Sequence, residues 1–166
     1  SAWVVSIGRG ILIFIVMIGV SPLIASFFKI ADAKQLIVFM SIVPLLRGFI
    51  NPAEANFQKN LQFKYEFFFR STIFAFDALI AIIATIILHS PYGIAVGVVS
   101  GAILEVILSF TLISLKPKLI FNKDQIVQIV HSGKWVTAYG ILNYFSMKGD
   151  NIVVGRLFGS FSLGIY

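Results

Sequence analysis

The sequence predicts an all-α protein that crosses a membrane several times. Of its 166 residues, 58% are apolar and only 12% are charged, whereas soluble domains average about 45–50% apolar and about 25% charged residues. The mean hydropathy of +0.96 indicates the same class. Thirteen basic and seven acidic side chains cannot hydrate the surface of so apolar a chain, so a lipid bilayer is its expected solvent.

Charge and cysteine content exclude other classes. Cysteine is absent, which excludes a disulfide scaffold and a thiolate metal site. The net charge of +6 lies in short clusters between apolar runs, as in cytoplasmic loops of membrane proteins. We therefore expect membrane lipids as partners and no nucleic acid. Because the chain starts without a signal pattern and ends without a polar tail, we interpret it as an internal piece of a longer protein.

Two apolar runs open the chain. Residues 10–28 contain no charge over 19 residues, and a helix of that length measures about 28 Å, which matches a hydrocarbon core of about 30 Å. After a short polar turn, residues 36–50 form a second run that Pro44 and Arg47 interrupt. This run is too short to span alone, so we expect it to borrow residues 31–35 or to kink.

Three further spans are predicted. Residues 67–88 and 92–115 form an antiparallel pair, because only an HSPYG turn joins them. The fifth span covers residues 135–158 and is interrupted by Lys148, Gly149, Asp150 and Asn151. It is therefore expected to be a broken or cavity-facing helix.

The connector after the second span carries a helix-start signature. Asn51 is the expected N-cap, Pro52 occupies the first helical position and Glu54 the third. Apolar residues then recur every three or four positions: Phe57, Leu61, Tyr65 and Phe68. This pattern predicts an amphipathic helix in the membrane interface, with an ordinary soluble-facing connector as the alternative.

A second connector, residues 122–133, repeats this pattern. Asn122 is the expected N-cap and Gly133 the expected helix stop. Four apolar residues lie between them: Ile126, Val127, Ile129 and Val130. This segment is therefore also predicted to be an amphipathic helix in the membrane interface, with an ordinary soluble-facing connector as the alternative.

The distribution of Lys and Arg predicts the orientation. The stretches 47–70 and 116–134, which include the two connectors, carry four basic residues each, and Arg9 makes nine, whereas the opposite turns carry only Lys29 and Lys34. Because positively charged loops stay in the cytoplasm, the connectors and the start of the chain are predicted to be cytoplasmic. Spans one, three and five then run outward.

Arg70 and Asp77 are the charges of the third span. They are seven residues apart and therefore share one helical face. Because a charge at the bilayer centre costs about 2.5–3.5 kcal/mol on insertion scales, Asp77 should face protein or water. The pair is either functional or an ion pair that fixes the rotation of the helix.

Glu105 is the only charge of the fourth span. It belongs to a ridge of residues spaced by four: Gly93, Gly97, Gly101, Glu105 and Ser109. Because glycines allow a neighbouring helix to approach closely, Glu105 is predicted to point into a bundle or cavity. The alternative is a glycine zipper with an incidental carboxylate.

The fifth span holds the remaining candidates, Lys148, Asp150 and Arg156. Charges at this density require a water-filled vestibule or the outer interface. The sequence contains no phosphate-binding glycine loop, HExxH motif or Ser-His-Asp grouping. We therefore expect no enzyme, with no catalytic residue, no metal site and no cofactor.

Three stretches carry a resemblance to a known family. Asn51, Pro52 and Ala53 match the NPALARLER-like text that follows its fourth span, and Gly133 matches the start of its seventh, although Trp135 stands where a proline is usual. The ending matches a D-x-x-x-I-G-R-x-L-G-like pattern at Asp150, Val154, Gly155, Arg156, Leu157 and Gly159. The chain thus resembles polysaccharide-export flippases of the multidrug/oligosaccharidyl-lipid/polysaccharide superfamily.

The resemblance implies a domain organisation. Residues 1–121 would be spans three to six of a first lobe, residues 122–133 a cytoplasmic linker between lobes, and residues 134–166 the seventh span. The implied cellular location is the bacterial or archaeal inner membrane. The implied function is transport of a polyprenyl-pyrophosphate-linked oligosaccharide for export of O-antigen, lipopolysaccharide or exopolysaccharide, with a polysaccharide polymerase or export proteins as partners.

Site residues follow from this hypothesis. Arg70, Arg156 and Lys148 are expected to bind the pyrophosphate by charge-assisted contacts. Asp77, Glu105 and Asp150 are expected to be coupling or cavity carboxylates. Two alternatives stay open. A cation-coupled drug exporter of the same superfamily would have an acidic cavity, and a non-transporting structural subunit would keep its three carboxylates paired and dry.

Overall fold

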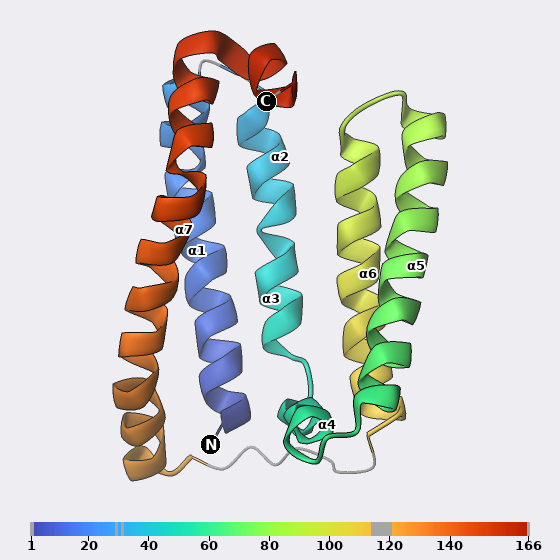
Figure 1. Ribbon diagram of the computed structural model, residues 1–166, viewed down its shortest axis with the longest axis vertical. Helices are drawn as coiled ribbons and strands as arrows, with labels where there is room; N and C mark the ends of the chain where they lie inside the picture. The colour runs from blue at the N-terminus through green and yellow to red at the C-terminus, as the bar shows by residue number, and fades with distance from the viewer. Residues whose placement is uncertain (1, 29, 31, 114–120, 166) are drawn as a thin grey trace.

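Long helices make up nearly all of the computed structural model (Figure 1). The structure describes residues 2–28, 30, 32–113 and 121–165, and no strand occurs among them, so the all-α class is confirmed. The elements in chain order are α1 (Ala2–Phe28), α2 (Ala33–Met40), α3 (Ile42–Gly48), the 3-10 turn η1 (Pro52–Glu54), α4 (Ala55–Lys59), α5 (Phe63–Leu88), α6 (Tyr92–Thr111) and α7 (Lys123–Ile165).

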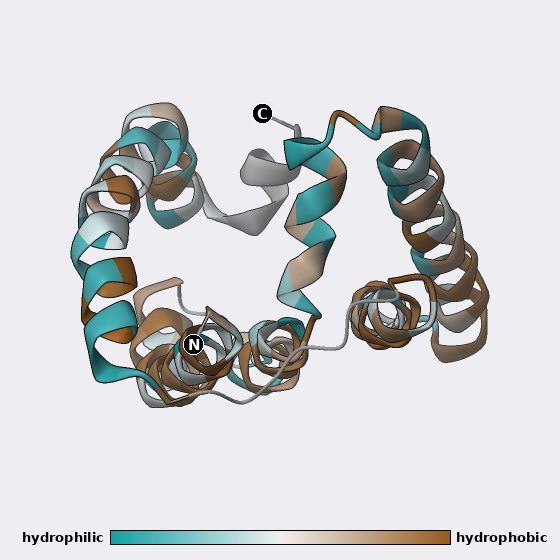
Figure 2. Ribbon diagram, turned by 90° about the horizontal axis from the view of Figure 1, so that it is seen from below, coloured by the Kyte–Doolittle hydropathy of each residue, from teal (hydrophilic) through white to brown (hydrophobic). Residues whose placement is uncertain are grey.

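The long helices stand in a row in the order α7, α1, α2–α3, α6 and α5 (Figure 1). Helices α1, α5 and α7 run in one direction, while α2–α3 and α6 return. The start of α1, the η1–α4 connector and the start of α7 lie at the same ends of the helices, at the bottom of Figure 1, and this side of the molecule is here named the connector end. Seen from that end, α7 and the connector carry many hydrophilic residues, whereas α1, α3 and α6 are largely hydrophobic (Figure 2).

Three helices, α1, α5 and α6, are long and apolar enough to cross a membrane. A fourth crossing is available where α2–α3 continues through a 69° bend into the connector. The predicted fifth span lies in α7, which is not among these helices because polar residues are spread along its length. The described residues therefore give three or four candidate spans, whereas the sequence predicts five.

The second apolar run breaks between α2 and α3, as its proline predicts. Pro44 has no N–H to bond to the carbonyl of Met40, so the helix loses a hydrogen bond at that point. At the break, the Ser41 hydroxyl donates to the Val38 carbonyl at 2.6 Å. The run also begins early, at Ala33, so both expectations for this span are confirmed.

The first connector begins as predicted but ends early. The Asn51 side chain accepts a hydrogen bond from the Ala53 N–H at 3.0 Å, which confirms the N-cap. A continuous amphipathic helix through Phe68 is wrong, because Leu61 takes a left-handed conformation at φ 54°. The Gln62 N–H then bonds back to the Phe57 carbonyl at 2.7 Å. This is a Schellman-type stop with leucine in the usual glycine position.

The α5–α6 hairpin packs through the glycine ridge. A Cβ on Gly97 would lie 2.5 Å from the Ala81 Cβ, and one on Gly101 would lie 3.0 Å from the Asp77 Cβ. All five ridge residues are buried. The prediction that the ridge faces protein is therefore confirmed.

Helix α7 differs from its prediction in two places. The Asn122 side chain accepts from the Asp124 and Gln125 N–H groups at 3.1 and 3.3 Å, so this N-cap is confirmed. The helix does not stop at Gly133, where a Cβ would meet nothing within 4 Å, and it is not interrupted at residues 148–151. Its one non-helical residue is Gly159, at φ 82°.

Candidate functional site

A cluster of four charged side chains, here named the ionic cluster, lies toward the connector end. Glu105 of α6 accepts from Arg47 Nε at 3.0 Å and from Arg70 Nη1 at 3.2 Å. The Nη2 of Arg70 also contacts Glu54 of η1 at 2.7 Å. One buried carboxylate thus joins α3 to α5 through α6, and Arg70 extends the connection to η1.

The two signs of charge differ in exposure. The side chain of Glu105 is 5% exposed and that of Glu54 is 15% exposed, whereas Arg47 and Arg70 are 53% and 45% exposed. The carboxylates therefore lie beneath the guanidinium groups. Burial raises the pKa of the Glu54 carboxyl above its usual 4.5, and nearby Arg70 opposes that shift.

Asn51 and Ser109 fix the connector against α6 beside the cluster. The Asn51 N–H donates to Ser109 Oγ at 3.1 Å, and the Asn51 amide donates to the Ser109 carbonyl at 3.3 Å. Both residues are fully buried. Because Ser109 follows Glu105 by one helical turn, these bonds place η1 and its Glu54 next to Arg70.

Two hollows border the ionic cluster. The larger, here named the charged cleft, has a volume of about 340 Å³, and the smaller one has about 180 Å³. Ser6, Arg9 and Arg47 line both. The ionisable groups that line the cleft are Arg9, Arg47, Arg70, Glu54, Glu66 and Glu105.

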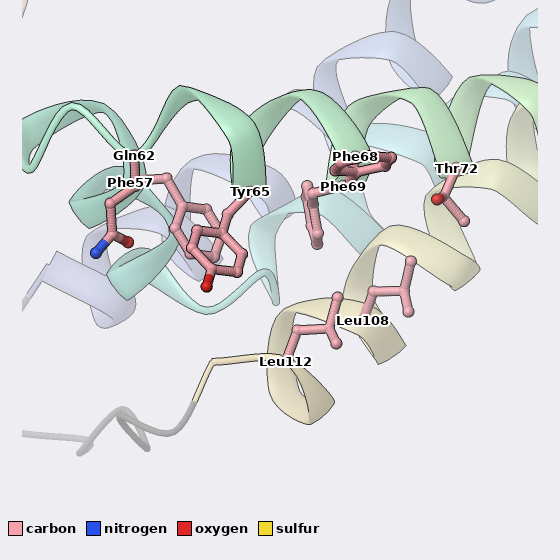
Figure 3. Close-up of a pocket in the computed structure, with 8 residues that line it drawn as sticks. All are labelled: Phe57, Gln62, Tyr65, Phe68, Phe69, Thr72, Leu108 and Leu112. Atoms are coloured by element: carbon pink, nitrogen blue, oxygen red, sulfur yellow. The ribbon is translucent and has the colours of Figure 1, made fainter.

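An apolar hollow of about 540 Å³, here named the aromatic groove, lies between α4–α5 and α6. Figure 3 shows aromatic side chains of α5 on one side and Leu108 and Leu112 of α6 on the other. The rings of Phe57 and Tyr65 stack with centroids 6.4 Å apart. Phe57 also lines the charged cleft, so the groove and the cleft share a wall.

Comparison with known proteins decides the family. A model of the polysaccharide biosynthesis protein family matches residues 1–166, the full length of the chain. The chain belongs to the polysaccharide biosynthesis protein family. No curated protein and no solved structure matches it.

Membership of this family, together with the apolar helices, makes the chain a membrane protein and fits a membrane flippase role in general. It confirms the family resemblance that rests on Asn51-Pro52-Ala53 and the Gly155-Arg156 ending. In this family member, the first of these motifs caps the connector that carries Glu54 into the ionic cluster.

Arg70 does not pair with Asp77, although the two residues share a helical face. Arg70 instead reaches across to Glu105 and Glu54, while Asp77 packs under Gly101. Among the residues that the structure describes, Asp77 forms no ion pair. Two helical turns separate the residues along α5, so a carboxylate on the neighbouring helix is easier for Arg70 to reach.

The structure does not bring the α7 candidates to the ionic cluster. The Arg156 guanidinium lies over the Phe27 ring, 5.1 Å from its centroid. Phe27 belongs to the last turn of α1, at the end of the helix away from the connector end. Lys148 and Asp150 are exposed on α7. Of the predicted site residues, Arg70 and Glu105 meet in the ionic cluster, and among the described residues no ion pair joins Lys148 or Arg156 to it.

Sequence reasoning assigned no site role to Arg47 or Glu54. Arg47 had a signal, because a charge inside an apolar run of one span requires a partner, just as Glu105 does in another. Arg47 and Glu105 are 58 residues apart in the sequence, and this separation gives no indication that their side chains meet. Glu54 was assigned only to the capping pattern, which gives no information about its side-chain contact with Arg70.

Proposed function

We propose that this chain is part of a flippase that moves a polyprenyl-pyrophosphate-linked oligosaccharide across the inner membrane. One observation supports this ligand class: the charged cleft and the aromatic groove share Phe57 as a wall. An amphiphile with an anionic head and a hydrocarbon chain needs these two environments side by side. The family, named for polysaccharide biosynthesis, supplies the biological context.

In this proposal the protein does no covalent chemistry and needs no cofactor. The ionic cluster links α3, α5 and α6 near the connector end, so rearranging it would change how these helices meet. Arg70 borders the cleft in which the head is loaded, while Arg156 and Lys148 of α7 contribute nearer the opposite end. Alternating access would then carry the pyrophosphate between two groups of cations.

The predicted orientation places the connector end in the cytoplasm. Nine basic residues against two support it, and Figure 1 places both connectors at the same end. Cysteines at Lys59 and Lys123 should be shielded from an impermeant external thiol reagent, and a cysteine at Ala33 should be labelled. External labelling at Lys59 would reverse the orientation.

The transport proposal is tested by export of surface polysaccharide from cells that carry the full-length protein. Arg70→Lys and Arg156→Lys keep the charge but lose the planar guanidinium fork. In Arg70 this fork contacts Glu54 and Glu105 at the edge of the cleft, and in Arg156 it would contact the phosphate. We expect both variants to reduce export at least several-fold at matched membrane abundance. Normal export from both would remove these two arginines from substrate handling.

The alternative of a non-transporting subunit requires three paired, dry carboxylates. Glu105 meets this condition, since it is buried against two arginines. Asp150 is exposed, and Asp77 forms no ion pair among the described residues. Two of the three carboxylates therefore do not meet the condition, which supports the transporter over the structural subunit.

A further inference from the structure

We infer that Arg9 and Arg47, which the sequence did not single out for binding, form the phosphate contact of this protein near the connector end, and that Arg70 is a positioning residue. This inference rests on the proposed function and names the residues that recognise the pyrophosphate head. The contact would lie between α1 and α3, on the side of the charged cleft away from the aromatic groove.

The placement of the acidic groups supports this side of the cleft. The smaller hollow, of about 180 Å³, has no carboxylate in its lining, which consists of Ser6, Arg9, Gly10, Ile13, Val43, Pro44, Arg47 and Gly48. The three carboxylates of the cleft come from η1, α5 and α6. The lining of the smaller hollow therefore offers an anion two arginines and no acidic residue.

Arg9 and Arg47 both have N–H groups that can donate hydrogen bonds to a ligand. Arg9 is exposed and forms no ion pair within the described part of the chain. Arg47 contacts Glu105 through Nε, and its side chain is half exposed. Both arginines line one hollow, and a phosphate bound there would accept charge-assisted hydrogen bonds from them.

The contact between α1 and α3 fixes the spacing of these arginines. A Cβ on Gly10 would lie 2.7 Å from the Pro44 carbonyl oxygen, and one on Gly48 would lie 3.1 Å from the Ser6 carbonyl oxygen. A side chain at Gly10 would push α1 and α3 apart, and one at Gly48 would make a tight contact between them. Because Glu105 also holds Arg47 from α6, the site is organised before a ligand arrives.

Arg70 is engaged differently. Its two terminal nitrogens already contact two carboxylates, at 2.7 and 3.2 Å. A phosphate would have to displace a carboxylate to reach the same nitrogens. Arg70 thus keeps Glu105 and Glu54 in place, and through Glu105 it helps to orient Arg47.

Binding to the purified full-length protein in neutral-lipid nanodiscs tests the inference. The probes are polyprenyl pyrophosphate placed in the nanodisc, inorganic pyrophosphate in the buffer, and nanodiscs doped with an anionic phospholipid. The test variant is Arg9→Gln, which breaks no ion pair of the described residues. The matched control is Lys34→Gln, which removes one exposed positive charge from α2.

We expect Arg9→Gln to weaken polyprenyl pyrophosphate binding about ten-fold or more, with an unchanged melting temperature, and Lys34→Gln to bind like the parent. Competition by inorganic pyrophosphate would support phosphate as the recognised group. If Arg9→Gln lost binding of the anionic phospholipid to the same extent, and the parent protein showed no preference for the pyrophosphate lipid, the assignment of Arg9 as a substrate contact would be overturned. Undiminished binding by a folded Arg9→Gln overturns the inference alone, whereas absence of binding by the parent protein overturns the proposed function.

Discussion

The α5–α6 hairpin and helix α7 both contain glycines and charged residues, but the surroundings of these residues differ between the two regions. Both have glycines within long helices. A side chain on Gly97 would collide with Ala81, whereas nothing lies within 4 Å of the position a Cβ would take on Gly133, Gly140 or Gly149. Glycine spacing alone therefore does not identify a packing face, because its meaning depends on whether another helix occupies that face.

Charges in the two regions differ in the same way. Glu105 is buried between two arginines from two other helices. Lys148, Asp150 and Arg156 lie exposed on α7, and Arg156 contacts an aromatic ring rather than a carboxylate among the described residues. The hairpin thus buries its carboxylate in one ionic cluster, whereas the charged side chains of α7 are exposed at the surface of the chain.

The largest expected effect comes from filling the glycine ridge. Gly97→Leu should destabilise the protein by about 3 kcal/mol or more, because the side chain would force α5 and α6 apart. Gly140→Leu on α7 should be neutral or stabilising by up to about 1 kcal/mol, since leucine is the better helix former. Thermal unfolding of both full-length variants in detergent measures the difference. Equal melting temperatures would mean that α5 and α6 do not pack through this ridge.

An intermediate effect is expected from neutralising the buried carboxylate. Glu105→Gln keeps the shape of the side chain but removes the charge between Arg47 and Arg70, which should cost about 2 kcal/mol. Asp150→Asn, at an exposed position of α7, should change stability by less than about 0.5 kcal/mol. Chemical unfolding of the two variants compares them. A larger loss of stability from Asp150→Asn than from Glu105→Gln would mean that the carboxylate that contributes more to stability lies on α7.

The smallest effect concerns pH. Because burial raises the folded-state pKa of Glu54, the folded protein retains this proton at pH values where the unfolded chain has lost it. Its contribution to stability should therefore fall as pH rises from about 4.5 through the raised pKa. Glu54→Gln should flatten this part of the stability–pH curve, measured by chemical unfolding across this pH range. An identical slope in parent and Glu54→Gln would assign the pH dependence to other groups.

Local and periodic features could be predicted from the sequence alone. The caps at Asn51 and Asn122, the break caused by Pro44 and the inward face of the Gly93–Ser109 ridge all depend on residues within about one helical turn or on a fixed spacing of four. Such features need no knowledge of the neighbouring helix. The membrane class followed from composition for the same reason.

The tertiary structure alone decided which charges meet. Arg47 and Arg70 are 58 and 35 residues from Glu105, and helical spacing wrongly favoured Asp77 as the partner of Arg70. The sequence also did not show that Leu61 would end the connector helix, which allows Phe57 to stack against Tyr65 and form the aromatic groove. Ion pairs and hollows depend on the positions of several helices at once, and those positions follow from packing between helices rather than from the periodicity of any one of them.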